Sequence, residues 1–235
     1  LQSRSLIDYQ AIKSKPADRD HYLKQLEAVS QKAFNAGTRN QQMAYLINLY
    51  NARTIRLITD HYPIKSIRSI GWLPGAAWRK EVVTLFEKKF AEHIEHEILR
   101  KQYPEPAIHF ALVCTAKGCP PLRAEAYRAD KLEAQLRDQE EIFMANPIKN
   151  RVDAADRRVY LSPIFEWFAA DFEKQSGSVL AYLKPFFPKE QAAALKDDFT
   201  IEYTDYDWSL IGGKQTWNFR HTMPIDESLA TPRSR

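Results

Sequence analysis

Residues 41–61 read QQMAYLINLYNARTIRLITDH, the most strongly apolar helical pattern in the chain. Met43, Leu46 and Ile58 belong to a set of apolar side chains that occupy nearly every face of a helix with this periodicity. Such a helix is typical of the centre of a protein, with other elements packed around it. We therefore expect a central helix over 41–61, which Pro63 ends.

Two asparagines, Asn48 and Asn51, interrupt this apolar pattern. A buried asparagine must find hydrogen-bond partners. Each of the two therefore either clamps a loop against the helix or belongs to a functional site. We keep both interpretations and count Asn48 and Asn51 as candidate binding residues.

Outward from this helix, helical and strand-like patterns follow one another without a regular βαβα alternation. The chain therefore predicts an α+β fold in which helices pack on a small, mostly antiparallel sheet. No Ser/Gly/Pro-rich linker divides the chain, so we expect residues 1–235 to form a single domain with an irregular tail over 211–235. The expected helices cover 18–36, 90–102, 122–145, 162–172, 178–187 and 188–197, and the expected strands cover 82–86, 108–114 and 159–161.

Composition argues against several classes of protein. The 34 basic and 30 acidic residues give a net charge of +4 and are interspersed, whereas a nucleic-acid-binding protein needs a basic stripe. No apolar stretch reaches the ~20 residues that cross a bilayer, so we expect no membrane span. With seven glycines and no glycine-rich phosphate loop, the chain shows no nucleotide cradle, and we expect no cofactor.

The segment from His109 to Pro121 is the strongest candidate for chemistry, because an expected strand runs through a tight loop into an expected helix. If Pro120 is the first helical residue, Cys119 is the N-cap. Its sulfur would then lie at the positive end of the helix dipole, which lowers a thiol pKa and favours the nucleophilic thiolate. Gly118 would supply an unusual backbone angle in the loop. The alternative is a small buried cysteine at a helix start.

His109 opens the expected strand among apolar residues. It is either a core residue or the base that activates the thiol, because a strand–loop–helix turn can bring Cys119 back beside the strand. Cys114 ends the same strand, and we expect it to pack in the core. We therefore predict no stable disulfide between Cys114 and Cys119, because Cys114 would point away from the loop.

Histidines and acids cluster in the helix expected over 90–102. His93 and Glu97 are four residues apart and share a face, a spacing that is compatible with a metal site together with His96. The zinc-protease pattern His-Glu-x-x-His is absent, and a charged, solvated helix face is the alternative. We expect no metal and keep His96 as a candidate binding residue.

The chain resembles the domain of unknown function 547 family over roughly residues 40–210. The stretches that carry the resemblance are AYLINLYNA (44–52), YPIKSI (62–67), IEH (94–96), HFALVC (109–114), GCPPL (118–122) and YDWSL (206–210). It implies a fold related to papain-type cysteine peptidases and transglutaminases, in a permuted order because the histidine precedes the cysteine. It also implies Cys119 as nucleophile, His109 as its partner and Glu95 as the acid that orients the histidine. Bacterial members often carry signal peptides, which implies a periplasmic or secreted location.

Residues and resemblance together predict a thiol-dependent protein with a Cys119–His109–Glu95 site in a papain-like groove. The expected ligands are amides, peptides or thiols such as glutathione, and the expected activity is that of a cysteine peptidase, an amidase-like hydrolase or a transferase. The alternative is a non-catalytic module that binds a ligand or a protein and keeps the papain-like fold.

Overall fold

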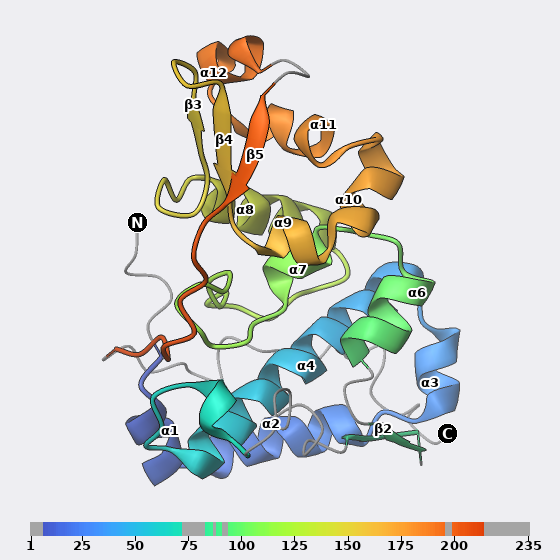
Figure 1. Ribbon diagram of the computed structural model, residues 1–235. Coiled ribbons are helices and arrows are strands. Elements are labelled where there is room, and N and C mark those ends of the chain that lie inside the picture. Colours follow the sequence, from blue (N-terminus) through green and yellow to red (C-terminus); the bar gives the residue numbers. More distant parts are fainter. Residues whose placement is uncertain (1–6, 72–82, 87, 91–93, 196–198, 214–235) are drawn as a thin grey trace.

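Helices make up most of the chain in the computed structural model, which describes residues 7–71, 83–86, 88–90, 94–195 and 199–213 (Figure 1). The predicted α+β class is confirmed. The α-helices are α1 (Tyr9–Ser14), α2 (Ala17–Glu27), α3 (Gln31–Ala36), α4 (Arg39–His61), α6 (Arg100–Gln102), α7 (Ile108–Ala111), α8 (Leu132–Met144), α9 (Ile164–Trp167), α10 (Ala169–Ser176), α11 (Val179–Leu183) and α12 (Lys189–Ala194). They are joined by the 3-10 helices η2 (Ile67–Ser69) and η4 (Lys184–Phe186) and by the π-helix η3 (Ile94–Leu99).

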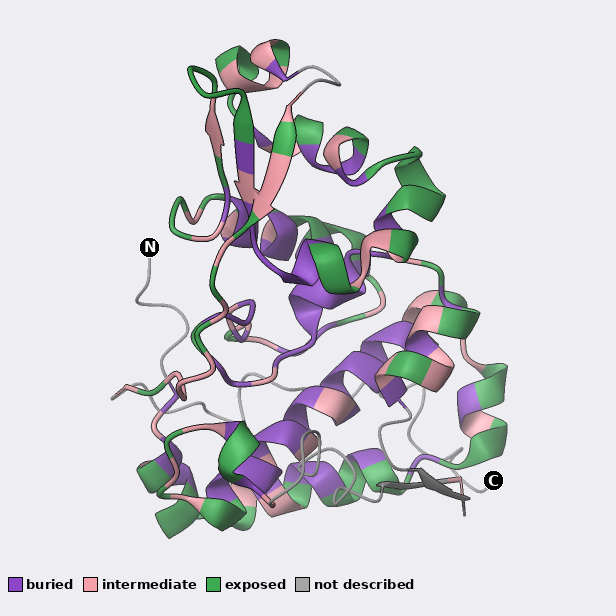
Figure 2. Cartoon of the chain, in the orientation of Figure 1, coloured by how far each residue is buried: buried purple, intermediate pink, exposed green. Residues whose placement is uncertain are grey.

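The predicted central helix is confirmed as α4, the longest described helix. A capping box begins it, in which Thr38 Oγ1 accepts a hydrogen bond from Gln41 N and Gln41 Oε1 accepts one from Thr38 N. The turn at Tyr62 and Pro63 follows its last residue. Buried side chains cover most of its length, which explains its unusual apolarity (Figure 2).

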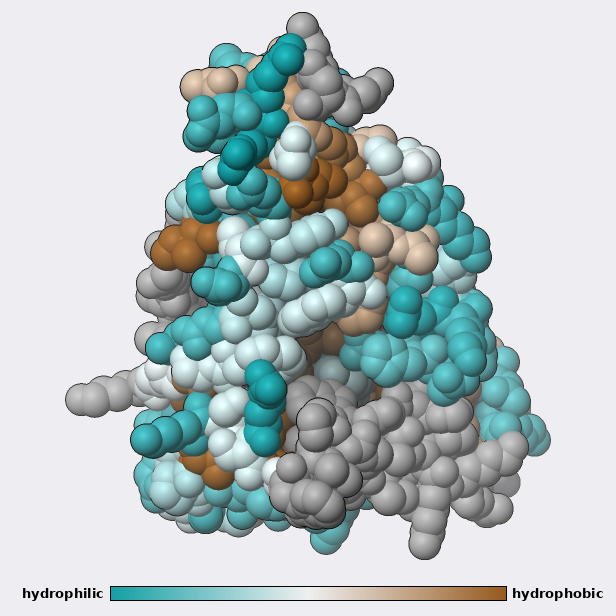
Figure 3. All heavy atoms as spheres, in the orientation of Figure 1, coloured by the Kyte–Doolittle hydropathy of each residue, from teal (hydrophilic) through white to brown (hydrophobic). Residues whose placement is uncertain are grey.

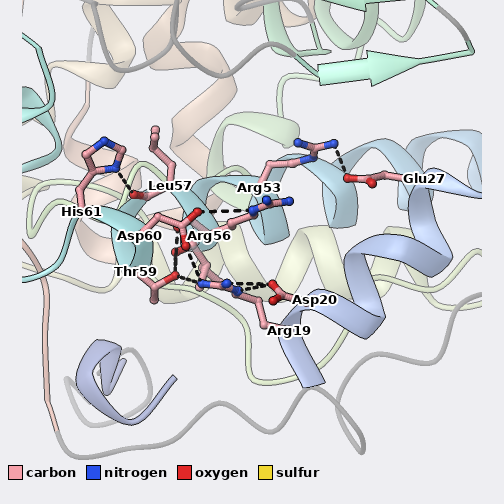
Figure 4. Close-up of polar contacts among 10 residues, drawn as sticks. Arg19, Asp20, Glu27, Arg53, Arg56, Leu57, Thr59, Asp60 and His61 are labelled. Atoms are coloured by element: carbon pink, nitrogen blue, oxygen red, sulfur yellow. Dashed lines mark hydrogen bonds and ion pairs between the residues drawn. The ribbon is translucent and has the colours of Figure 1, made fainter. Parts of the chain in front are cut away.

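Helix α2 packs along α4, and a charge network centred on the buried Arg19 joins the two helices (Figure 4). Arg19 of α2 is only 6% exposed, and its guanidinium pairs with Asp60 at 3.0 Å and with the neighbouring Asp20 at 2.8 Å. Arg19 also donates a hydrogen bond to the Thr59 hydroxyl. A buried arginine needs such partners, so this network fixes how α2 lies on α4.

Two small sheets complete the fold. Strands β1 (Val83–Leu85) and β2 (Lys88–Phe90) form an antiparallel pair. The second sheet has the order β3-β4-β5, in which β3 (Arg151–Asp153) is antiparallel to β4 (Arg158–Leu161) and β4 is parallel to β5 (Thr200–Tyr203). The three-stranded sheet is therefore mixed, with one antiparallel and one parallel pairing. Strand β4 confirms the prediction at 159–161, and β1 lies within the strand predicted at 82–86, of which residue 82 is outside the described residues.

The strand predicted over 108–114 is wrong. Residues Ile108–Ala111 form the single turn α7, and Leu112 to Cys114 belong to no described strand. The turn is held by successive backbone hydrogen bonds, in which the carbonyls of Glu105, Pro106 and Ala107 accept the N–H groups three residues later at 3.1, 3.0 and 3.1 Å. An unbroken apolar run fits a buried helix as well as a buried strand, and periodicity alone does not separate them.

Several predicted helices are shorter than expected or divided. The helix predicted over 122–145 begins only at Leu132, and residues 122–131 are irregular. The helix predicted over 162–172 starts at Ile164 and is interrupted at Phe168, which separates α9 from α10. The segments predicted as 18–36 and 90–102 are each divided, into α2 and α3 and into η3 and α6.

Two hydrophobic clusters form the interior. The larger surrounds α4, and the smaller lies between α8, the three-stranded sheet and α9 to α11. Helix α7 contributes to both, because Ile108 and Ala111 belong to the first cluster and Phe110 to the second. Tyr206 packs against both as well. On the face in Figure 3, apolar atoms gather between the three-stranded sheet and α11, and hydrophilic residues cover α10.

None of the helices in the described ranges is long and apolar enough to span a bilayer.

Candidate functional site

The segment that carries the candidate chemistry is fixed to the central helix by Asn51. Its Nδ2 donates to the Ala111 carbonyl at 2.9 Å, and its Oδ1 accepts the Val113 N–H at 3.0 Å. One turn earlier, Asn48 clamps Tyr127 in the same way, at 2.8 and 2.9 Å. Of the two interpretations left open above, the structure supports the clamp, because both amides are committed to backbone groups.

The two cysteines lie together in the loop that follows α7. The backbone N–H of Cys114 donates to Cys119 Sγ at 2.8 Å, and Cys114 Sγ contacts the Tyr206 hydroxyl at 3.1 Å. Cys114 is half-buried, whereas Cys119 is only 4% exposed. Cys114 therefore packs against the core only in part, whereas Cys119, for which a small buried cysteine was the alternative, is the buried member of the pair. Both cysteines are free in the structure.

Residues 206–211 form a strap that lies against the loop of residues 114–119, which carries both cysteines and is called the thiol loop below. Its backbone pairs with residues 115–118 through three hydrogen bonds, Lys117 N to Ser209 O at 2.9 Å, Gly118 N to Asp207 O at 2.9 Å and Ile211 N to Thr115 O at 2.8 Å. Thr115 has a φ of 64°, which is strained for a β-branched residue. Strain of this kind persists where surrounding contacts over-determine the backbone, and it is found at functional sites.

Gly118 has a role that differs from the one predicted. Its φ is not positive, so the loop does not need glycine for an unusual backbone angle. A Cβ at this position would instead lie 2.9 Å from three ring carbons of Tyr206. Glycine is required because the aromatic ring lies directly over the backbone.

Gly118→Ala is accordingly expected to push Tyr206 away from Cys114. Overpacking of this kind costs about 1–2 kcal/mol of unfolding free energy, and urea denaturation measures it. Gly212→Ala, directly after the strap, is the matched control, because its Cβ would meet nothing closer than Ile7 O at 4.0 Å. Equal stability of the two variants would contradict the close approach.

The predicted helix start at Cys119 is also wrong. No helix begins at Pro120, since residues 120–131 are irregular, so the helix-dipole argument does not apply. Burial, together with the hydrogen bond and charge of Cys114, raises the pKa of the Cys119 thiol well above its usual value. Hydrogen bonds from Cys119, Tyr206 and the Ala116 backbone lower the pKa of Cys114, although burial opposes them.

His109 lies in α7 with its ring almost completely buried. Its Nε2 pairs with Asp171 Oδ2 at 2.8 Å, and the ring stacks on Phe168 at a centroid distance of 3.8 Å and an angle of 17°. Nδ1 has no hydrogen-bond partner among the described residues, and its nearest acid is Glu95, with Oε1 at 3.8 Å. Asp171, and not Glu95, therefore makes the hydrogen bond to the His109 ring.

Asp171 is itself held by Arg100, whose Nε and Nη2 bind its two oxygens at 2.7 and 3.3 Å. Burial by itself would raise the pKa of the Asp171 carboxyl, but the hydrogen bonds and charges of His109 and Arg100 outweigh it and hold this pKa well below its usual range. Asp171 is thus a carboxylate at neutral pH. Arg100 and Asp171 also line a cavity of about 300 Å³ beside α10.

His96 is exposed on η3, where Arg100 Nη1 donates to its Nδ1 at 3.2 Å. It also stacks on Phe168 at 6.4 Å. His96 therefore contacts Phe168, which stacks on His109, and Arg100, which binds Asp171. His93 lies outside the described residues, and among those described no three acids, histidines or cysteines are grouped to hold a metal.

Two adjacent aromatic residues connect the histidine to the thiols. Phe168 stacks on His109, and Trp167 packs on Tyr206 at a centroid distance of 4.8 Å, while Tyr206 contacts Cys114. Glu95 is connected to Cys114 electrostatically, because its negative charge opposes the lowering of the Cys114 pKa. No described hydrogen bond joins His109 to either sulfur, since Nε2 pairs with Asp171 and Nδ1 has no partner.

Residues 34–144 match the family described as "Protein of unknown function, DUF547". The match supports the resemblance over a segment that contains α4, Glu95, His109 and both cysteines. Asp171 and Tyr206 lie beyond it. No curated protein and no solved structure matches the chain.

Proposed function

We propose that this chain is a thiol-dependent protein that acts on amide, peptide or thiol ligands. Its reaction centre combines the thiol loop, which carries Cys114 and Cys119, with His109 and the carboxylates of Glu95 and Asp171. The papain-like relationship, in permuted order, and a periplasmic or secreted location are parts of the same proposal.

The single observation that carries the proposal is the Trp167–Phe168 pair. It packs at once on the histidine and on the tyrosine that contacts Cys114. This cluster supports the proposal because covalent catalysis needs a nucleophile, a base and an orienting group in one site, and the base has to come within hydrogen-bond reach of the thiol when a ligand binds.

The contacts of His109 suggest how the ring would act. A carboxylate only accepts hydrogen bonds, so Asp171 favours a proton on Nε2. The lone pair then resides on Nδ1, the nitrogen without a partner. Nδ1 is therefore the atom that would take a proton from an incoming thiol or a bound ligand, and Glu95 would stabilise the imidazolium that forms.

Alkylation by iodoacetamide at pH 6 tests the proposal. Because an activated thiol has a larger thiolate fraction at this pH, we expect the thiol loop to react about tenfold faster than N-acetylcysteine. His109→Ala should remove this advantage. The control is His21→Ala, on the exposed face of α2. Reaction of both cysteines at or below the rate of N-acetylcysteine would rule out an activated thiol.

A second candidate is a non-catalytic binding module. The observation that favours it is the absence, among the described contacts, of a hydrogen bond between His109 and a sulfur. Catalytic hydrogen bonds are often long in the absence of substrate, so this geometry does not decide between the two. Fast alkylation that His109→Ala leaves unchanged would favour the binding module, because the histidine would then not act on the thiol.

A further inference from the structure

We propose that Cys114 is the thiol that reacts, that its substrates are small-molecule disulfides, and that Cys119 completes the reaction as the resolving thiol. This inference rests on the proposed function and names the reacting atom and the ligand class. It assigns the role of nucleophile to Cys114 and not to Cys119, the residue that the sequence suggested.

Accessibility favours Cys114 as the entry point. Cys119 Sγ is buried behind the loop, where it accepts the Cys114 N–H at 2.8 Å and lies 3.9 Å from the Leu112 carbonyl. Cys114 is half-buried, and its Sγ faces the Tyr206 hydroxyl. A ligand therefore reaches Cys114 first, beside Trp167, which is 46% exposed.

Three donors surround Cys114 Sγ, and each stabilises a thiolate there. They are the Cys119 thiol, the Tyr206 hydroxyl and the Ala116 N–H, and together they lower the pKa of Cys114. Burial and the Glu95 charge oppose them. Hydrogen bonds of this kind increase the fraction of Cys114 that is the nucleophilic thiolate.

Cys119 suits the second step. Its sulfur already lies 2.8 Å from the Cys114 backbone nitrogen, so the resolving thiol is next to the residue that it attacks. Lys149 donates to the Cys119 carbonyl at 2.7 Å, and its positive charge favours the Cys119 thiolate when that thiolate forms. Burial lowers the pKa of this lysine, which makes it a better proton acceptor than an exposed lysine.

The reaction balances in two exchanges. The Cys114 thiolate attacks one sulfur of a disulfide R–S–S–R, forms Cys114–S–S–R and expels R–S⁻, which takes a proton from water. Cys119 then attacks Cys114 Sγ, forms the 114–119 disulfide and expels the second R–S⁻, which takes up the proton that Cys119 loses. The protein loses two electrons and the substrate gains them. The bridge is an intermediate that an external thiol reduces, which is compatible with the prediction that no stable disulfide forms.

The experiment uses the full chain, reduced and then mixed with bis(2-hydroxyethyl) disulfide under anaerobic conditions. Intact mass and a non-reducing peptide map identify the products. In the wild type we expect the 114–119 bridge and no retained adduct. Cys119→Ser should retain one adduct on Cys114, and Cys114→Ser should gain none at a comparable rate. Cys119→Ala replaces Cys119→Ser if the buried hydroxyl prevents folding, which circular dichroism reports.

Tyr206→Phe adds a matched test, because it removes one hydroxyl donor and keeps the ring over Gly118. We expect the first exchange to slow about three- to tenfold, the size of effect that one lost hydrogen bond has. Tyr160→Phe, on β4, should leave the rate unchanged.

The outcomes separate the inference from the proposed function. An adduct on Cys119 in the wild type, or fast reaction of Cys114→Ser, would assign the reaction to Cys119 and overturn the inference while leaving a thiol-dependent protein. A persistent Cys114 adduct in the wild type would overturn the resolving role. Unreactive thiols toward both iodoacetamide and the disulfide would overturn the proposed function as well.

Discussion

Asn51→Ala is expected to lower the free energy of unfolding by about 3–5 kcal/mol, because each buried group left without a hydrogen bond costs ~1–3 kcal/mol and the lost side-chain volume adds to this. The substitution leaves the Ala111 carbonyl and the Val113 N–H without the partner that Asn51 provides, and Asn51 is only 2% exposed. Urea denaturation followed by circular dichroism measures the loss.

Asn35→Ala is the matched control, because this asparagine lies exposed on α3. We expect it to change stability by less than about 0.5 kcal/mol, as exposed substitutions do. The clamp also sets where α7 ends and where the thiol loop begins. Asn51→Ala should therefore slow alkylation of Cys114 even under conditions in which the variant is folded. A loss below about 1 kcal/mol would show that the clamp contributes little.

The second large effect is a pH dependence that comes from Glu140. This glutamate of α8 is 6% exposed and accepts a hydrogen bond from the Tyr182 hydroxyl of α11. Burial raises its pKa to about 7, and the Glu105 and Glu141 charges add to this, while the Tyr182 hydrogen bond and Arg137 oppose it. The folded chain thus holds a proton that the unfolded chain releases near pH 4.5.

Folded Glu140 binds more protons than unfolded Glu140 between pH 4.5 and 7, so stability must fall as the pH rises through this window. At 1.36 kcal/mol per pH unit, the contribution of Glu140 to the free energy of unfolding decreases by roughly 3 kcal/mol across this window. Glu140→Gln should remove the decrease, because glutamine does not titrate. Unfolding free energies at pH 4.5, 6 and 8 measure it.

Glu133→Gln provides the control for this pH dependence. Glu133 is exposed in the first turn of the same helix. We expect it to leave the slope of stability against pH as it is in the wild type. Parallel curves for the wild type and Glu140→Gln would mean that Glu140 is ionised in the folded state throughout this range.

The spacing of apolar residues along the chain predicted those elements of the fold that short-range sequence signals define. Helix α4 was predicted within two residues at its start, because a long apolar period and a following proline define a helix by themselves. The run over 108–114 was misassigned, since a short run of apolar residues does not distinguish one helical turn from a strand. Nothing in the run itself indicated that the carbonyls of Glu105 and Pro106 would begin a helical turn.

The site was predicted only in part, for a related reason. His109, Glu95 and the two cysteines lie within 25 positions of one another and could be named together. Asp171, Arg100 and Phe168 could not, because nothing local to Asp171 indicates that it would meet a histidine 62 positions earlier. Tyr206 and the rest of the strap determine how exposed each cysteine is. Residues 109–121 alone therefore could not show which of the two cysteines is the one that reacts.

The strap also has a consequence for synthesis of the chain. Tyr206 lies 92 positions after the Cys114 it contacts, so this pairing has a high contact order and forms late in folding. Ile211 leaves the ribosome 211 − 119 = 92 residues after Cys119, which corresponds to about 5–20 s at usual elongation rates. During that interval both thiols belong to a nascent chain without the cover of Tyr206. A cell that makes this protein must keep both thiols reduced until the strap has been translated. Oxidants present earlier would oxidise the thiols before the chain folds.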